Sequence, residues 1–238
     1  MSADLGTVDA EGARRALRLG QAVVLPNPSP LTSAVAGTDP RAVNTVKGRP
    51  ADQAVALWVH HARTLGALTG VLALNAEGTA VARRLLTDER VTLLVPLSDS
   101  TRHPDWLAPA SQDGWALLFG ARWAPLLPVV DDFPVLYVSS ANSTGHPPAA
   151  TAREAVAMFP PATAVLGTAS LTGAGEGTGG TGEGTGGTDD DRPRRSATTT
   201  LRLHPDGRID LHRHGAQDRA FPSTEQYLDH LRTTHRGE

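Results

Sequence analysis

The chain has 238 residues and a formal net charge of −3, and 39% of its residues are hydrophobic. This size and composition suit one ordinary domain with its own core. The absence of cysteine excludes disulfides, thiolate catalysis and cysteine-ligated zinc, and the mild negative charge gives no overall attraction to nucleic acid. No apolar run approaches the ~20 residues that a membrane span needs, and the acidic N-terminus is unlike a signal peptide. We therefore expect a cytoplasmic protein that does not bind membranes.

Apolar runs and turn residues alternate along the chain in a pattern that predicts strands mixed with helices. Asp9, Asp39 and Thr151 are good N-terminal caps, and Asp206-Gly207 is a strong hairpin signal. Such a mixture indicates an α/β or α+β layered domain. Helices are predicted at 10–19, 40–47, 61–68, 77–86, 152–159 and 224–232. Strands are predicted at 22–25, 54–59, 91–97, 115–119, 134–138, 163–166, 198–203 and 208–213.

Residues 171–195 interrupt this pattern. The heptapeptide Gly-Glu-Gly-Thr-Gly-Gly-Thr occurs there twice in tandem, at 175–181 and 182–188. Such a stretch has too few apolar residues to offset the entropy of ordering it, and it does not join a strand to a helix as a phosphate-binding glycine loop does. We therefore predict a single domain made of residues 1–170 and 196–216, a flexible insertion at 171–195 and a helical tail at 217–238.

Two short segments carry polar groups suited to an anion. Lys47 is the only lysine beside 21 arginines, and it lies with Arg49 at a break between a helix and a strand. An ammonium and a bidentate guanidinium two residues apart can contact one anion. Ser140 and Asn142 lie in the polar loop after the strand at 134–138, and ligands of α/β proteins often bind at strand ends. A solvated charged turn and a structural loop are the plainer alternatives for these segments.

Together these segments resemble the signature motifs of YrdC-like proteins. Lys47-Gly48-Arg49-Pro50 is similar to the KxRP motif of that family, and residues 139–148, Ser-Ser-Ala-Asn-Ser-Thr-Gly-His-Pro-Pro, are similar to its [ST]SAN-x-[ST]G-x-P segment. Residues 198–201 and 211–216 resemble the family's ST-V-V stretch and its final R-x-G-A turn. The motifs occur in the family's order, and the resemblance covers residues 11–216 apart from the insertion.

The resemblance implies a twisted mixed sheet flanked by helices, with a concave basic cavity. It also implies an activity, which is the synthesis of threonylcarbamoyl-AMP from ATP, bicarbonate and L-threonine with release of pyrophosphate. That product serves the t6A modification of tRNA. By match to the motifs, Lys47, Arg49, Ser140 and Asn142 would be the catalytic residues that hold the ATP phosphates and the carboxyl intermediate.

The same match places two further residues at the site. Arg213 would lie near the nucleotide, and Thr198 would replace a family serine near the amino acid. No protein nucleophile is required, because bicarbonate and then the carbamate attack, so the protein must neutralise charge and align its substrates. Mg²⁺ is expected to accompany the ATP phosphates without dedicated protein ligands. The histidines, without cysteines or paired carboxylates nearby, predict no metal site.

The sequence departs from the family pattern on the amino-acid side. The P-T-E-T-x-Y-G-L segment is absent after the first strand, where Asn27 follows the retained Pro26. Trp58 stands where family members often carry a polar residue or histidine, and Leu118 stands at the position of the arginine in V-R-V-P. An unpaired carboxylate in an apolar pocket is costly. We therefore expect an altered pocket, in which Asn27, Trp58, Leu118 and Thr198 bind an amino acid or similar small acid other than free threonine.

Two other functions fit the same residues. One is a non-catalytic module that binds a nucleotide, tRNA or double-stranded RNA through the basic cavity. The other is an accessory protein in carbamoyl transfer. The lost segment after the first strand favours these two functions, whereas the retained Lys47 and Asn142 favour the enzyme and the carbamoyl-transfer protein. An enzyme should bind ATP in a Lys47-dependent way, whereas an RNA module should bind tRNA with strong salt dependence.

Overall fold

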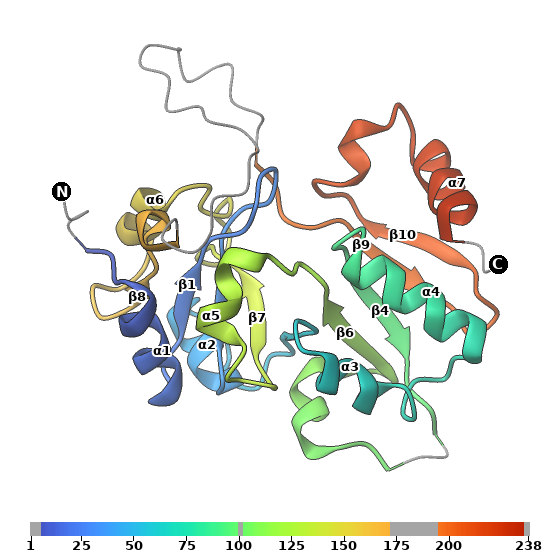
Figure 1. Cartoon of the computed structure of the whole chain (residues 1–238), viewed down its shortest axis with the longest axis horizontal. Helices are drawn as coiled ribbons and strands as arrows, with labels where there is room; N and C mark the ends of the chain where they lie inside the picture. The colour runs from blue at the N-terminus through green and yellow to red at the C-terminus, as the bar shows by residue number, and fades with distance from the viewer. Residues whose placement is uncertain (1–5, 100–101, 172–194, 236–238) are drawn as a thin grey trace.

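One mixed sheet of ten strands organises the molecule. The computed structural model describes residues 6–99, 102–171 and 195–235. The strands run in the order β10–β9–β4–β6–β3–β7–β2–β1–β8, and β5 pairs with the first two residues of β6. Figure 1 shows β8 and β1 at one end of the molecule and β9 and β10 at the other. The strands are β1 (Val23–Leu25), β2 (Ala34–Gly37), β3 (Ala56–Trp58), β4 (Thr92–Pro96), β5 (Ser111–Gln112), β6 (Trp115–Phe119), β7 (Tyr137–Ser140), β8 (Ala164–Val165), β9 (Thr200–Leu203) and β10 (Ile209–Arg213).

The helices begin at side-chain caps that the sequence signals. Asp9 Oδ1 accepts a hydrogen bond from the Gly12 amide at 2.8 Å, and Asp39 and Thr151 cap their helices in the same way. These caps satisfy amides that have no partner within the helix. The α-helices are α1 (Ala10–Arg18), α2 (Pro40–Val46), α3 (Ala62–Leu68), α4 (Ala76–Thr87), α5 (Leu127–Val130), α6 (Ala152–Met158) and α7 (Thr224–His235), with short 3₁₀ helices at Asp105–Ala110, Ala124–Leu126, Thr168–Leu171 and Asp218–Ala220.

Helices cover one face of the sheet over its whole width. Side chains from α2, α3, α4, α6 and α7 share one buried cluster with alternate residues of the strands. On β4 and β6 these inward residues are Leu93, Val95, Ala116 and Leu118, all fully buried. Because side chains alternate along a strand, the residues between them must point to the other face.

That other face is covered over only part of its width. A second buried cluster joins α1 and α5 to β1, β2, β3 and β7. Beyond β3, four residues of β6, β4 and β9 on this face are only half-buried, namely Trp115, Leu117, Leu94 and Arg202. The covered and uncovered parts of this face meet near β3 and β6, and a cavity lies at that boundary.

The predicted fold class, an α/β layered domain with a mixed sheet, is confirmed. The structure adds β2, which the sequence pattern did not predict, and it places the strand predicted at 134–138 at Tyr137–Ser140. The predicted insertion at 171–195 lies almost entirely outside the described residues. The boundaries predicted for the domain and its helical tail stay predictions. Every helix in the described ranges is too short or too polar to cross a bilayer.

Candidate functional site

The cavity at the edge of the covered face measures about 290 Å³. This volume is at the lower end of the ~300–1,000 Å³ typical of pockets for small molecules. Its floor is apolar and its rim is polar. The apolar lining includes Leu31, Ala34, Ala56, Leu94, Leu117, Phe119 and Val138, and the polar lining includes Asn27, Arg49, Thr92, Ser139, Ser140, Thr198, Thr200, His212 and Arg213.

Strand register explains how distant segments meet in this cavity. Phe119 on β6 pairs with Thr92 on β4, Thr92 pairs with Thr200 on β9, and Thr200 pairs with Arg213 on β10. The four residues therefore form one row across four strands, and all four line the cavity. The shift in register between Leu211 and Arg213 is a bulge, a device that re-aims side chains at sheet edges.

Two arginines carry the positive charge of the cavity. Arg49 follows α2, and its Nη1 donates a hydrogen bond to Ser139 Oγ at 3.2 Å. Arg213 ends β10 on the other side of the cavity. Burial lowers the pKa of both guanidinium groups from its usual range, but arginine stays charged at neutral pH. None of the described residues that line the cavity is an aspartate or a glutamate, so the charge of this described lining favours an anionic ligand.

Lys47 is close to the cavity but does not line it. The side chain is 1% exposed, and its Nζ donates to the carbonyl oxygen of Ser140, to the carbonyl oxygen of Asn142 at 2.8 Å and to Asn142 Oδ1 at 2.9 Å. In return, Thr144 Oγ1 donates to the Lys47 carbonyl at 3.1 Å. All three ammonium hydrogens thus have partners within the protein. Lys47 ties the loop after β7 to the turn after α2.

The charge on Lys47 is held at a cost. Burial, and then repulsion from the nearby Arg49, lower the pKa of Lys47 from 10.5 to about 7. Three oxygen acceptors favour the ammonium form, whereas burial and Arg49 favour the neutral amine. The balance makes this lysine titratable near neutral pH.

Asn142 completes the same network. Its Oδ1 accepts from Ser140 Oγ at 2.6 Å as well as from Lys47, and its Nδ2 donates to the carbonyls of Ser143 at 3.1 Å and His146 at 2.9 Å. Every polar atom of this amide therefore has a partner in the loop. The four predicted phosphate-holding residues are thus brought together, but only Arg49 and Ser140 line the cavity.

The residues predicted for the second substrate separate into two groups. Asn27 and Thr198 line the cavity. Thr198 Oγ1 shares a 2.6 Å hydrogen bond with Thr92 Oγ1. Asn27 is 4% exposed, and its Nδ2 donates to the Thr32 carbonyl at 2.9 Å. Its Oδ1 is buried without a hydrogen-bond partner among the described residues, and an unsatisfied buried acceptor is costly.

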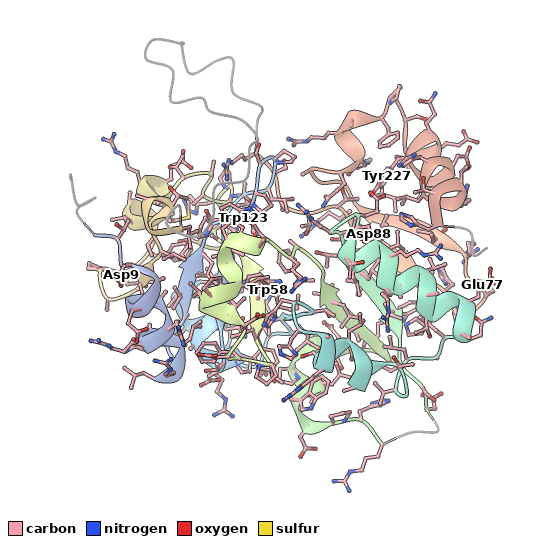
Figure 2. All side chains as sticks on the ribbon, viewed as in Figure 1. Asp9, Trp58, Glu77, Asp88, Trp123 and Tyr227 are labelled. Carbon is pink, nitrogen blue, oxygen red and sulfur yellow. The ribbon has the colours of Figure 1, made fainter. Side chains whose placement is uncertain are left out.

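Trp58 and Leu118 do not line the cavity, which corrects their predicted placement. Both side chains are fully buried. Trp58 lies on the cavity face of the sheet but in the second cluster, which includes α5 (Figure 2). Its Nε1 donates to the Ala121 carbonyl at 2.9 Å, and its ring meets Phe119 edge-on with 5.7 Å between ring centres. Leu118 points to the opposite face, and its neighbour Leu117 lines the cavity instead.

Sequence reasoning missed several cavity residues. Thr92, Thr200 and His212 line the cavity although the motifs did not select them. A signal existed for Thr92 and Thr200, because each is a polar residue that alternates with buried leucine on a strand. Among the described residues, no group of three histidines or carboxylates is placed to hold a metal ion.

Solved structures define this architecture as a YrdC-like fold. No protein-family model and no curated protein sequence matches the chain. Sua5 from P. abyssi, in a crystal structure complexed with L-threonine, matches with a TM-score of 0.57 at 18% identity, over 87% of this chain and 55% of that one. YciO from E. coli matches with a TM-score of 0.56 at 11% identity, over 87% and 88% of the two chains.

A third similar structure is full-length HypF in the phosphate- and nucleotide-bound form. It matches with a TM-score of 0.57 at 14% identity, over 87% of this chain and 24% of HypF. This chain therefore spans about half the length of Sua5 and a quarter of the length of HypF. At these identities the similarity establishes the fold, and the chemistry has to be argued from the cavity.

Proposed function

We propose that the cavity binds the phosphates of ATP and that the protein makes a carbamoyl adenylate from ATP, bicarbonate and an amine-bearing small acid. The observation that carries this proposal is the convergence of Arg49 and Arg213 on one cavity whose described lining residues include no carboxylate. Guanidinium groups bind phosphate oxygens with two parallel hydrogen bonds. The similarity to HypF, which was solved with phosphate and nucleotide bound, supports the same ligand class.

The chemistry needs charge neutralisation and alignment, and it needs no protein nucleophile. The amine of the second substrate adds to bicarbonate and water leaves, which gives a carbamate. A carbamate oxygen then forms a bond to the α-phosphorus of ATP, and the bond from that phosphorus to the bridging oxygen of pyrophosphate breaks. Arg49 and Arg213 would balance the charge that gathers on the phosphates. Mg²⁺, carried by the phosphates, would neutralise part of the same charge.

The loop after β7 would act through its position. Lys47 fixes the carbonyl groups of Ser140 and Asn142, and this holds the Ser140 hydroxyl at the cavity. Lys47 is therefore a positioning residue in this proposal, whereas Arg49 touches the ligand. This division differs from the sequence prediction, in which both residues hold phosphate.

The lining of the cavity suits a second substrate other than threonine. The wall at the V-R-V-P position supplies Leu117 and Phe119, and neither can pair with a carboxylate. Asn27 and Thr198, which line the cavity, are the polar side chains that we propose lie near the amine of this substrate. We propose that turnover is faster with an acid that has a larger apolar side chain than threonine, because the apolar cavity residues Leu31, Phe119 and Val138 then gain a partner.

Calorimetry with ATP tests the nucleotide site. We expect Arg49→Met and Arg213→Met to weaken ATP binding at least about tenfold, the loss from one charge-assisted contact. Arg208→Met is the matched control, because this exposed arginine on the β9–β10 turn does not line the cavity. Equal ATP binding by all four proteins would exclude the site.

Pyrophosphate release then tests the reaction. Purified protein is mixed with ATP, bicarbonate and single amino acids that range from threonine to leucine and phenylalanine. Release that depends on bicarbonate and on one amino acid supports the proposed enzyme, and efficient release with threonine would refute the altered pocket. ATP-independent binding of tRNA with a steep salt dependence would instead favour the RNA-binding alternative.

A further inference from the structure

The uncovered part of the sheet continues the cavity outward in ordered rows. Register places Phe119 beside Thr92 in the first row, Leu117 beside Leu94 in the second row and Trp115 beside Pro96 in the third. The first two rows line the cavity. Trp115 is two residues beyond Leu117 on the same strand and the same face, so it lies about 7 Å further out. The cavity floor therefore runs onto this face without a step.

Three planar side chains meet on this face, where Arg202 and His204 both contact the Trp115 ring. Arg202 follows Leu94 in the second row, because these two residues pair between β4 and β9. Its guanidinium carbon lies 4.9 Å from the centre of the Trp115 ring. His204 meets the same ring edge-on, with 5.8 Å between ring centres. Arg202 Nε is buried and has no hydrogen-bond partner, so the stack holds the guanidinium in this place.

We propose that the shelf formed by Leu94, Leu117, Trp115 and Arg202 binds the purine base of the nucleotide whose phosphates the cavity holds. Nucleobases stack on aromatic rings and on the planes of arginine side chains, and their flat apolar faces fit the half-buried leucines of the shelf. This inference rests on the proposed function, and it assigns the base to residues outside every motif of the sequence.

The distance between shelf and phosphate site suits one nucleotide. Ala56 on β3 pairs with Val138 on β7, and Leu57 pairs with Leu118 on β6. Leu117 therefore lies two strand spacings from Val138, which is about 10 Å. Ser139 and Ser140 follow Val138 directly and line the cavity. A base on the shelf can thus reach these hydroxyl groups through its ribose and α-phosphate.

The test compares ATP with inorganic tripolyphosphate, which has the phosphates and lacks the base. We expect Trp115→Leu to weaken ATP binding about tenfold, as expected for losing one stacked base, and to leave tripolyphosphate binding unchanged. Arg202→Lys keeps the charge and removes the plane, so it should have the same selective effect. Trp123→Leu is the matched control, because this half-buried tryptophan packs in the second cluster and does not line the cavity.

Each outcome tests whether the shelf binds the purine base. If Trp115→Leu and Arg202→Lys keep their melting temperature and bind ATP like the unaltered protein, the shelf does not hold the base. If either variant loses both ligands equally, the residues act on the phosphates and the inference is wrong. If Trp115→Leu weakens only a short single-stranded RNA, the shelf belongs to RNA, which also overturns it. If the unaltered protein binds neither ATP nor tripolyphosphate, the proposed function itself fails.

Discussion

Replacing Lys47 by methionine removes the ammonium group that holds the loop after β7. The carbonyl oxygens of Ser140 and Asn142 then lose their buried donor, which costs about 1–3 kcal/mol for each unsatisfied group. Part of this loss is offset, because the variant no longer buries a charge. The offset is largest where Lys47 is protonated, so the size of the effect depends on pH.

The sign of that dependence follows from the lowered pKa of Lys47. Between about 7 in the folded protein and 10.5 in the unfolded chain, the unfolded state binds one more proton than the folded state. The free energy of unfolding therefore rises with pH in this window, by up to about 1.4 kcal/mol per pH unit from this group. Below pH 7 both states are protonated and the contribution is flat. The difference between the unaltered protein and Lys47→Met should grow from pH 7 to pH 9.

The composition of the chain makes this titration unusually easy to follow. Because Lys47 is the only lysine, lysine labelled with ¹³C at the ε-carbon gives a single side-chain NMR signal. We expect that signal to titrate with a midpoint near 7, and urea unfolding of both proteins from pH 6 to pH 9 to diverge. A midpoint near 10.5, or parallel stability curves, would refute the reasoning.

Three further substitutions test the framework around the cavity. Asp218→Asn should cost about 1.5–3 kcal/mol at pH 7, because hydrogen bonds to a buried carboxylate from Thr199 and Gly215 weaken. Burial alone would raise the pKa of Asp218, but these bonds and His214 lower it below 3.8, so its stabilisation is present above that pH and is lost as the pH falls through the folded value. Gly215→Ala should cost about 1–3 kcal/mol, because its Cβ would lie 2.1 Å from the Thr199 nitrogen. Trp58→Ala should cost about 3–5 kcal/mol for a fully buried ring. Urea unfolding measures all three.

Two of these variants, Asp218→Asn and Gly215→Ala, have a control of the same type. Asp210→Asn alters a half-exposed carboxylate that pairs with His204, and it should change stability by less than about 1 kcal/mol. Gly66→Ala adds a methyl group in open space within α3 and should be neutral or stabilising. If Asp218→Asn and Asp210→Asn have equal effects, the network around Asp218 does not support the fold as argued.

Local signals in the sequence predicted most of the elements. The caps Asp9, Asp39 and Thr151 and the Asp206-Gly207 turn act over a few residues, and each is found where its residues indicate. β2 was missed because Ala34–Gly37 is short and rich in small residues. This segment becomes a strand because β1 and β7 pair with it on both sides, which is a tertiary effect that local propensity does not contain.

The site was predicted in its composition more than in its geometry. Counting from a motif gives a position along a strand but not the face, and one residue of register exchanges the faces. This is why Leu117, and not Leu118, lines the cavity. Lys47 was singled out correctly as unusual, but its partners lie more than 90 residues away in sequence. The sequence alone could not tell whether its ammonium faces a ligand or a loop.

The row from Phe119 to Arg213 has a consequence for biosynthesis. Its residues come from strands that precede and strands that follow residues 172–194 in the sequence. Ser196 likewise pairs with Leu31, which lies far from it in the sequence. A growing chain that has made α1 to α6 still lacks β9, β10 and therefore one wall of the cavity. The N-terminal part can acquire its helices and its first strand pairs while it emerges, but the anion site is completed only when Arg213 has been made. If the cavity binds ATP as proposed, nascent fragments that end before Arg213 should not retain it.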